Sequence, residues 1–330
     1  MFKHLPTTFT MRLIAIFALL MGLATFTASV QSTGVLIMAH GGSEEWNQHV
    51  KDAAASLEGQ YPVEFAWGMA NYVTLQKGIN RLEEKGVSEI IAVPLFISSH
   101  SLIIRQNSYL FGMRDSQPDR IMPLMHHSEE YIEMTGAEVD SSDYMHGMLM
   151  PPNLQQLDIN ANITMTAALD DHKVVAQILR DRISALSNNP SSETVILAAH
   201  GPNKESDNRQ WIANLESLSR KIQQQQKAEG KAYKQIFALT VRDDAPEAIY
   251  NQAKEHMRAM VRQANQFGDV IVVPVFLSSG GREQAIAERL EGLDFKWSGQ
   301  TLLPDEKLSN FLVNSVEQAV SEGQKTVEAQ

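Results

Sequence analysis

Short runs of consecutive apolar residues alternate along the chain with longer segments in which apolar residues recur every three or four positions. The runs end at Gly, Pro or Asn, as buried parallel strands do. The longer segments have the period of amphipathic helices. We expect strands at 34–39, 63–67, 89–97, 160–165, 194–199, 235–241, 269–277 and 295–299. We expect helices at 45–58, 72–85, 171–186, 207–228, 244–266, 283–291 and 305–321.

This alternation predicts an α/β fold, with doubly wound parallel sheets joined by right-handed crossovers. Asp170 or Asp171 can cap the helix that follows Leu169, and Pro304 suits a first helical turn. Ligands of open parallel sheets bind beyond the carboxyl ends of the strands. Residues that directly follow strands are therefore the first candidates for a functional site.

The chain contains one series of motifs twice, which indicates an internal duplication. The matching segments, in the same order, are 34–41 with 194–201, 90–99 with 270–279, and 169–174 with 303–308. We therefore expect two similar parallel-sheet domains, at residues 33–188 and 189–330.

The two repeats differ by one insertion. Pro94 and Leu169 are 75 residues apart, whereas Pro274 and Leu303 are 29 apart, so the first repeat carries 46 extra residues. These fall within about residues 103–158, beyond the carboxyl end of the third strand. We expect the insertion to cover the site rather than form a separate domain, and its removal to leave a folded protein.

Residues 12–25 form an apolar segment after a short basic start, and small residues follow it. This order is typical of a secretory signal peptide, which we place at residues 1–32, with the mature chain starting between about residues 28 and 34. It predicts an exported, periplasmic protein without a further transmembrane segment, or a membrane-anchored one if the segment stays uncleaved.

Composition limits the chemistry. There are 39 Asp and Glu residues against 28 Lys and Arg, for a net charge of −11, which argues against nucleic-acid binding. The absence of cysteine excludes disulfides, thiolate zinc sites, iron–sulfur clusters and cysteine nucleophiles. A metal would have to be held by His, Asp, Glu, Met or oxygen ligands.

Histidines follow three strands of the first repeat, at His40, His100 and His172. We favour a functional role for His40, because the duplication repeats it as His200. Gly41 and Gly42 let the chain turn and a ligand approach the backbone. His100 is open to a site role or a loop hydrogen bond, and His172 is better interpreted as a helix start.

Glu44 and Glu45 lie one turn beyond His40. They can place negative charge beside a metal, or simply complement the dipole at a helix start, and we favour the second interpretation for at least one of them.

The insertion is rich in residues that bind soft metals. It contains His126, His127 and His146 and seven methionines, including the stretch Met145–Met150. Thioether and imidazole groups together suit Cu(I), although methionine also fills irregular gaps in cores, which is the interpretation we favour. With its aromatic residues, the insertion is expected to offer a flat apolar surface; these are Tyr109, Phe111, Tyr131 and Tyr144.

Other chemistries lack their motifs. Histidine phosphatases need Arg before the histidine, where this chain has Ala39 and Ala199. No Gly-x-Ser-x-Gly elbow, Walker loop or Gly-x-Gly-x-x-Gly sequence occurs, so no organic cofactor is indicated.

The duplicated Ala-His-Gly motif, with Lys85-Gly-Val-Ser-Glu-Ile-Ile-Ala-Val-Pro-Leu-Phe96, resembles the class II tetrapyrrole chelatases, which include the sirohydrochlorin cobaltochelatases and ferrochelatases. The resemblance implies a bilobed fold with a cleft between its halves. It also implies a lyase of tetrapyrrole or cobalamin biosynthesis, whose partners are a tetrapyrrole such as sirohydrochlorin and a divalent metal substrate, Co²⁺, Fe²⁺ or Ni²⁺.

The resemblance implies catalytic and metal-binding roles for His40 and, after the Pro-Leu-Phe strand, for His100. Family chains often have Gly-x-His about eight residues past the proline, where this chain has Leu102. His126, His127 or His146 can approach the metal route. Substrate contacts are expected from Gly41, Gly42, Ser98, Ser99 and Arg105.

The second repeat keeps His200 but has Arg282 after Gly280 and Gly281, where a histidine is expected. We therefore expect one working site, in the first half. Because the chain is acidic and has an export signal, an alternative is an exported carrier of metal or haem on the same scaffold. Arg105, Arg114 and Arg282 are the candidate clamps for a carboxylate-rich substrate.

Overall fold

A computed structural model describes residues 32–328 of the chain. The signal peptide predicted at residues 1–32 lies outside this range, except for its last residue. Among the described residues, no helix has both the length and the hydropathy needed to cross a bilayer.

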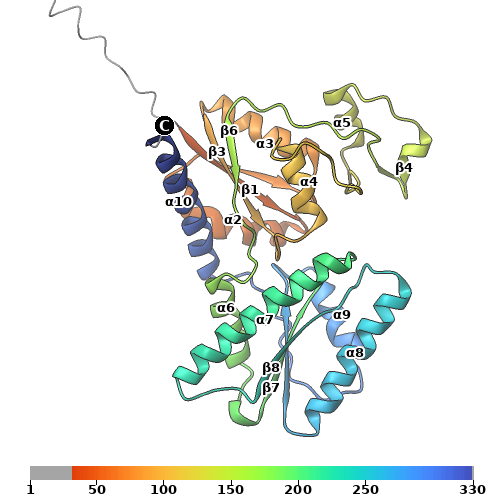
Figure 1. The fold of residues 1–330 in the computed structure, drawn as a ribbon, viewed down its shortest axis with the longest axis vertical. Helices are drawn as coiled ribbons and strands as arrows, with labels where there is room; N and C mark the ends of the chain where they lie inside the picture. Colours follow the sequence, from red (N-terminus) through yellow and green to blue (C-terminus); the bar gives the residue numbers. More distant parts are fainter. Residues whose placement is uncertain (1–31, 329–330) are drawn as a thin grey trace, which may run out of the picture. The chain divides into compact units, whose positions relative to one another are not determined.

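The first half is built on a parallel sheet of four strands (Figure 1), in the order β2-β1-β3-β6. The strands are β1 (Thr33–Ala39), β2 (Val63–Trp67), β3 (Glu89–Leu95) and β6 (Asn162–Met165). Ala39, the last residue of the central strand β1, is paired with Trp67 on one side and Leu95 on the other. The three strands therefore end together, and their following loops share one edge of the sheet.

The second half has a parallel sheet in the order β8-β7-β9, which repeats the order β2-β1-β3 and confirms the predicted pair of similar sheets. Its strands are β7 (Thr194–Ala199), β8 (Gln235–Thr240) and β9 (Val270–Val275). The strand predicted at 295–299 is wrong, since only Lys296 makes a bridge, to Ile271. Beyond Lys296 the chain turns at Gly299, whose φ of 70° is left-handed.

The predicted helices all form. They are α2 (Glu44–Glu58), α3 (Tyr72–Glu84), α6 (Lys173–Ser184), α7 (Glu205–Ala228), α8 (Glu247–Asn265), α9 (Arg282–Arg289) and α10 (Lys307–Glu328). The cap of α6 is His172, whose side chain accepts a hydrogen bond from the Val174 N–H, and not Asp170 or Asp171. Pro304 precedes α10 instead of lying in its first turn.

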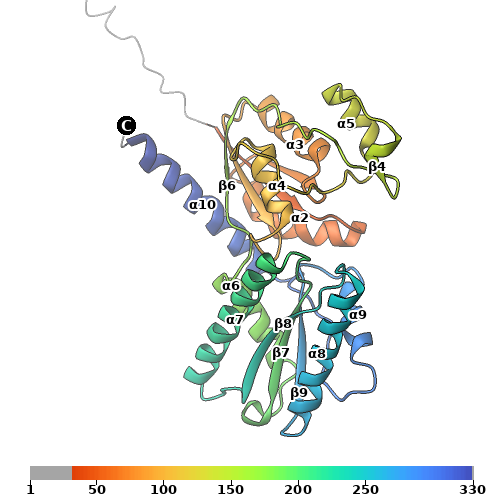
Figure 2. The ribbon, with the colours of Figure 1, turned by 45° about the vertical axis from the view of Figure 1, so that its right-hand side comes forward.

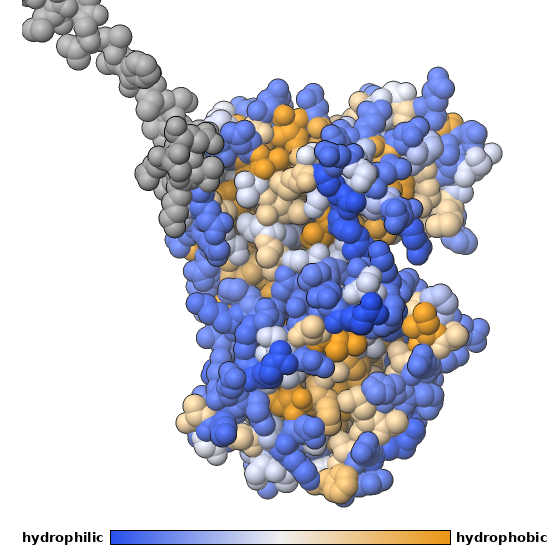
Figure 3. Space-filling model, in the orientation of Figure 1, coloured by the Kyte–Doolittle hydropathy of each residue, from blue (hydrophilic) through white to orange (hydrophobic). Residues whose placement is uncertain are grey.

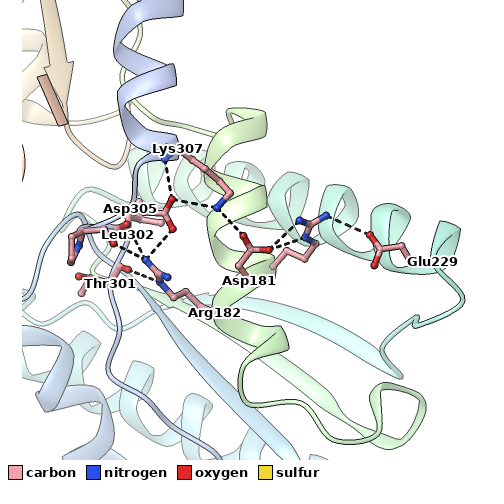
Figure 4. Close-up of polar contacts among 9 residues, drawn as sticks. Asp181, Arg182, Glu229, Thr301, Leu302, Asp305 and Lys307 are labelled. Atoms are coloured by element: carbon pink, nitrogen blue, oxygen red, sulfur yellow. Dashed lines mark hydrogen bonds and ion pairs between the residues drawn. The ribbon is translucent and has the colours of Figure 1, made fainter. Parts of the chain in front are cut away.

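Two helices pack on the sheet of the other half. α6 contacts α7 and β9, whereas the C-terminal α10 contacts α2 and β3. Figure 4 shows the polar contacts where these helices meet. Arg182 lies 3.2 Å from Asp305, and Lys307 lies 3.0 Å from Asp181. A division at residue 188 therefore separates the two sheets but not their helices.

Because α6 and α10 each pack on the sheet of the other half, part of the apolar core is shared between the halves. One cluster of buried side chains runs from β1 and α2 through α6 and α10 to β7 and α7, so the two halves share it. Separate clusters lie on the other face of each sheet, under α3 in the first half and under α8 and α9 in the second. Figure 2 shows α8 and α9 on one side of the second sheet and α6 and α7 on the other.

The insertion shares the core under α3. It contains α4 (Leu102–Leu110), α5 (Ser128–Thr135) and the hairpin of β4 (Tyr144–Met145) and β5 (Met148–Leu149). The prediction of an aromatic surface is wrong for Tyr131 and Phe111, which are 0% and 6% exposed. These rings fill the core because α3 offers them an apolar face.

Candidate functional site

His40 is exposed at the carboxyl end of β1, on a turn that favours glycine at the next position. Gly41 has a φ of 76°, and a Cβ atom there would lie 3.3 Å from the Cβ of Trp67. Ser43 caps α2 by accepting a hydrogen bond from the Trp46 N–H, and Asn47 accepts one from the Gly42 N–H. Glu44 and Glu45 are first-turn acids of that helix. The backbone around His40 is therefore fixed on both sides.

The tautomer of His40 follows from its own hydrogen bond. Its Nδ1 lies 2.7 Å from the carbonyl oxygen of Gly41. Because a carbonyl oxygen can only accept, Nδ1 carries the proton and donates it. The neutral ring then keeps a lone pair on Nε2, which can bind a metal ion or accept a proton.

His100 is exposed in the loop after β3, and its backbone is held at both polar atoms. Its N–H donates to the Oγ of Ser98 at 3.1 Å. Its carbonyl oxygen accepts from the indole Nε1 of Trp211, on α7 of the second half, at 2.9 Å. The loop is thus fixed by the opposite half.

Ser98 and Ser99 have partners inside this loop. Ser98 is 2% exposed. The N–H and Oγ–H of Ser99 both donate to the carboxylate of Asp170, at 2.8 and 2.6 Å. Asn214 of α7 donates to the same carboxylate at 2.9 Å. The two hydroxyls, predicted to contact substrate, hold the shape of the loop in this structure.

Two of the three arginines predicted as clamps, Arg105 and Arg282, are paired with aspartates, whereas the contact shown for Arg114 is made by its backbone carbonyl, with Gln156. Arg105 makes a two-pronged contact with Asp207 on α7, with N–O distances of 3.0 and 2.8 Å. Arg282 lies 2.9 Å from Asp244. Arg105 therefore joins the halves, because a guanidinium and a carboxylate match in geometry.

The histidines of the insertion lie in its turns, at His126 and His146, and at the start of α5, at His127. His127 lies 3.4 Å from Glu130, which itself pairs with Lys77 of α3. His126 and His146 are exposed at turns with positive φ. Met125, next to His126, accepts a hydrogen bond from Asn71 in the loop after β2. The insertion therefore borders the carboxyl edge of the first sheet.

His200 has a different environment from its counterpart His40. Its Nε2 lies 3.1 Å from Asp244 and its Nδ1 lies 3.5 Å from Asp243. Burial lowers the pKa of His200, but the contacts with the two carboxylates outweigh it and raise this pKa above its ordinary value. In turn, His200 and Arg282 hold the pKa of Asp244 well below its usual range.

Sequence reasoning missed Asp243 and Asp244. They directly follow the Val241-Arg242 pair after β8, so their position beyond a strand end was a usable signal. Asp243 also pairs with Arg289, which is 4% exposed on its side chain and stacks over the ring of Tyr250. Arg242 pairs with Glu205 at 3.0 Å. Gly280 and Gly281 are exposed at the start of α9, beside this network of charged groups.

Replacing Asp244 by asparagine is expected to lower the pKa of His200, because one of its two carboxylates is removed. The raised pKa of His200 stabilises the folded state. This stabilisation is present below about pH 6.5 and is lost as the pH rises through the pKa that His200 has in the folded state. Asp244 stays ionised in the folded state down to below about pH 4, since its pKa is lowered. The variant should thus lose most stability between about pH 4 and 6.5. NMR titration of His200 and urea unfolding at several pH values measure both effects; an unchanged His200 pKa would contradict the assignment.

Each half has a tryptophan that reaches a loop of the other half. The Trp211 indole donates to the His100 carbonyl, and a Cβ on Gly280, the counterpart of His100, would lie 3.9 Å from the ring of Trp46. Figure 3 shows the surface indented between the two halves at the right of the view. Within residues 32–328, no three His, Asp or Glu side chains group closely enough to form a metal centre.

A hollow of about 350 Å³ lies on β2 and α3, with Trp67 in its lining. Its lining includes Glu64, which pairs with Arg81 and Lys85 at 2.6 and 2.5 Å. The ion pairs occupy its polar groups, so we assign it no role in the site.

The fold is that of the tetrapyrrole chelatases. The structure is similar to SirB from Bacillus subtilis with Fe³⁺, with a TM-score of 0.56 and 15% identity over 89% of this chain and 98% of that one. It is also similar to the sirohydrochlorin chelatase SirB from Bacillus subtilis subspecies spizizenii in complex with cobalt, with a TM-score of 0.53 and 12% identity over the same shares.

A match to one protein family covers part of the chain. The profile of the CbiX family matches residues 34–108, a segment that contains both His40 and His100. No curated protein matches the chain. The resemblance to the class II tetrapyrrole chelatases is thus confirmed.

Proposed function

We propose that the protein inserts a divalent metal ion, Co²⁺ or Fe²⁺, into a modified tetrapyrrole such as sirohydrochlorin. The observation that carries the proposal is the placement of His40 and His100 beyond adjacent strands, within the segment that matches CbiX. The two similar SirB structures contain iron and cobalt, and one of those proteins is a sirohydrochlorin chelatase. Ni²⁺ is a third candidate substrate.

The proposed reaction exchanges the metal ion for two pyrrole N–H protons. The Nε2 of His40 can hold the ion or take up a proton, but one lone pair cannot do both at once. A second imidazole, from His100, allows the two tasks to be divided. A pair of neutral nitrogen ligands leaves open positions around the ion for the nitrogens of the macrocycle.

An exported carrier of metal or haem is the second candidate function. It is favoured by the ion pairs of Arg105 and Arg282, which occupy two of the three arginines predicted to bind a carboxylate-rich substrate. We place either function in the periplasm, on the basis of the signal sequence at residues 1–32.

Turnover separates the two functions. The mature protein is mixed with an excess of sirohydrochlorin and Co²⁺ or Fe²⁺, and the absorption spectrum is followed. A chelatase converts many equivalents of the tetrapyrrole per protein, faster than the uncatalysed reaction. A carrier binds about one equivalent of each ligand and leaves the rate of their union unchanged.

Metal binding is expected to depend on both histidines. The double variant His40→Ala, His100→Ala should lose most of its affinity for Co²⁺, measured by titration calorimetry. The affinity of the unaltered protein should fall in acid, since protons compete for imidazole. His256→Ala is the control, because this histidine is exposed on α8 in the other half. An affinity unchanged in the double variant would locate the ion elsewhere.

A further inference from the structure

The hairpin of the insertion places methionines opposite one another. Met145 of β4 is paired with Met148 of β5. The turn between them, His146 and Gly147, has φ values of 53° and 76°. Two consecutive left-handed residues define a type I′ turn, which fixes the register of a two-residue hairpin.

A third strand segment extends this row. Leu124 is paired with Leu149 in the antiparallel sense, and its N–H donates to the Leu149 carbonyl at 2.8 Å. One step along each strand places Met125 opposite Met148. Met125, Met148 and Met145 therefore form a row across the two strands of the hairpin and the bridged segment at Leu124, called the methionine row below.

Burial shows that the methionine row faces away from the core. Leu124 and Leu149 are 2% and 0% exposed, whereas Met125 and Met145 are 38% and 48% exposed. Side chains alternate between the faces along a strand, and residues directly opposite share a face. The leucines thus fill the core, Met125 and Met145 are exposed, and Met148 between them is half-buried.

We propose that the methionine row binds a soft monovalent cation, Cu(I) or Ag(I). Opposed Cβ atoms lie about 4.5–5.5 Å apart, and the flexible thioether side chains can bring three sulfurs onto one ion. Thioethers select Cu(I) over harder divalent ions, and the chain has no thiolate to compete. His126 and His146 each follow a member of the row and are exposed, so an imidazole can complete the coordination.

Anaerobic titration with Cu(I), in competition with a coloured Cu(I) chelator, tests the proposal on the purified full-length protein. We expect one equivalent to bind. In a sample with ¹³C-labelled methionine methyls, the signals of Met125, Met145 and Met148 should shift. Titration with Ag(I) should give the same pattern, and Co²⁺ should leave these signals unchanged. Absence of Cu(I) binding, or shifts confined to other methionines, would overturn the proposal.

The variant M125L/M145L/M148L keeps similar side-chain volumes and removes all three sulfurs, so it should stay folded. Its affinity for Cu(I) should fall by more than about 10-fold, as it does when a metal site loses its supporting groups. The control M113L/M134L changes two methionines of similar exposure, 41% and 40%, outside the row. An equal loss in both variants, or none in the first, would overturn the methionine row as the site. The proposal is independent of the His40 site, since Co²⁺ binding there should persist in the triple variant.

Discussion

Replacing His40 by alanine is expected to slow metal insertion by about 10²–10⁴-fold, the usual contribution of a general acid or base. His40 donates its Nδ1 proton to the Gly41 carbonyl, which leaves the Nε2 lone pair available. The substitution removes this lone pair. Initial rates of the absorption change, with sirohydrochlorin and Co²⁺ both in excess, measure the effect. Retention of the unaltered rate would remove His40 from the reaction.

His200→Ala is the matched control, because the duplication places it at the same point of the second sheet. Both its ring nitrogens face carboxylates, at 3.1 and 3.5 Å, and these raise its pKa and favour the imidazolium form. An imidazolium has no lone pair for a metal ion. We expect the variant to keep most of its activity, so equal losses from the two substitutions would show that the site spans both halves.

The order of the elements could be predicted well because their signals are local. Each strand of the Ala-His-Gly motif is a continuous apolar run, and a glycine with positive φ follows its histidine, at Gly41 and Gly201. At Gly201 any larger residue is also excluded by space, since a Cβ there would overlap the Thr240 side chain. The repeated motif is therefore sufficient to predict two equivalent strand ends.

The exchange of helices between the halves has no such local signal. The period of residues 305–321 shows that α10 has an apolar face, but not which sheet will cover that face. The contacts that decide it join distant segments, such as Arg182 with Asp305. For the same reason the pairing of Arg105 with Asp207 could not be predicted, because the two residues are far apart along the chain, and a substrate clamp was the expectation instead.

The contribution of the insertion to the stability of the first half also depends on contacts between distant segments. Its length and position predicted a removable cover, but its side chains complete the core beneath α3. Leu110, Leu124, Tyr131 and Leu149 are all 2% exposed or less. Removing residues 106–156 would uncover the apolar face that these side chains fill, so we expect the deletion to unfold the first half rather than leave it intact.

A single substitution tests this role of the insertion without deleting it. Tyr131→Ala should lower the free energy of unfolding by about 3–5 kcal/mol, the range for removing a large buried aromatic ring. The ring is 0% exposed, meets Tyr72 of α3 edge-on at 5.2 Å, and its hydroxyl donates to the Asn153 carbonyl at 3.3 Å. Urea unfolding followed by circular dichroism gives the change.

Tyr144→Ala provides the comparison, since it removes the same ring from the same insertion where 39% of the residue is exposed. Its cost should stay within about 0.5 kcal/mol, as for most surface substitutions. Both variants remove a tyrosine ring from the insertion of 46 residues that the second repeat lacks. The difference between their free energies of unfolding therefore measures the effect of burial. A similar small cost at Tyr131 would mean that the insertion rests on the first half without completing its core, and the deletion would again be expected to fold.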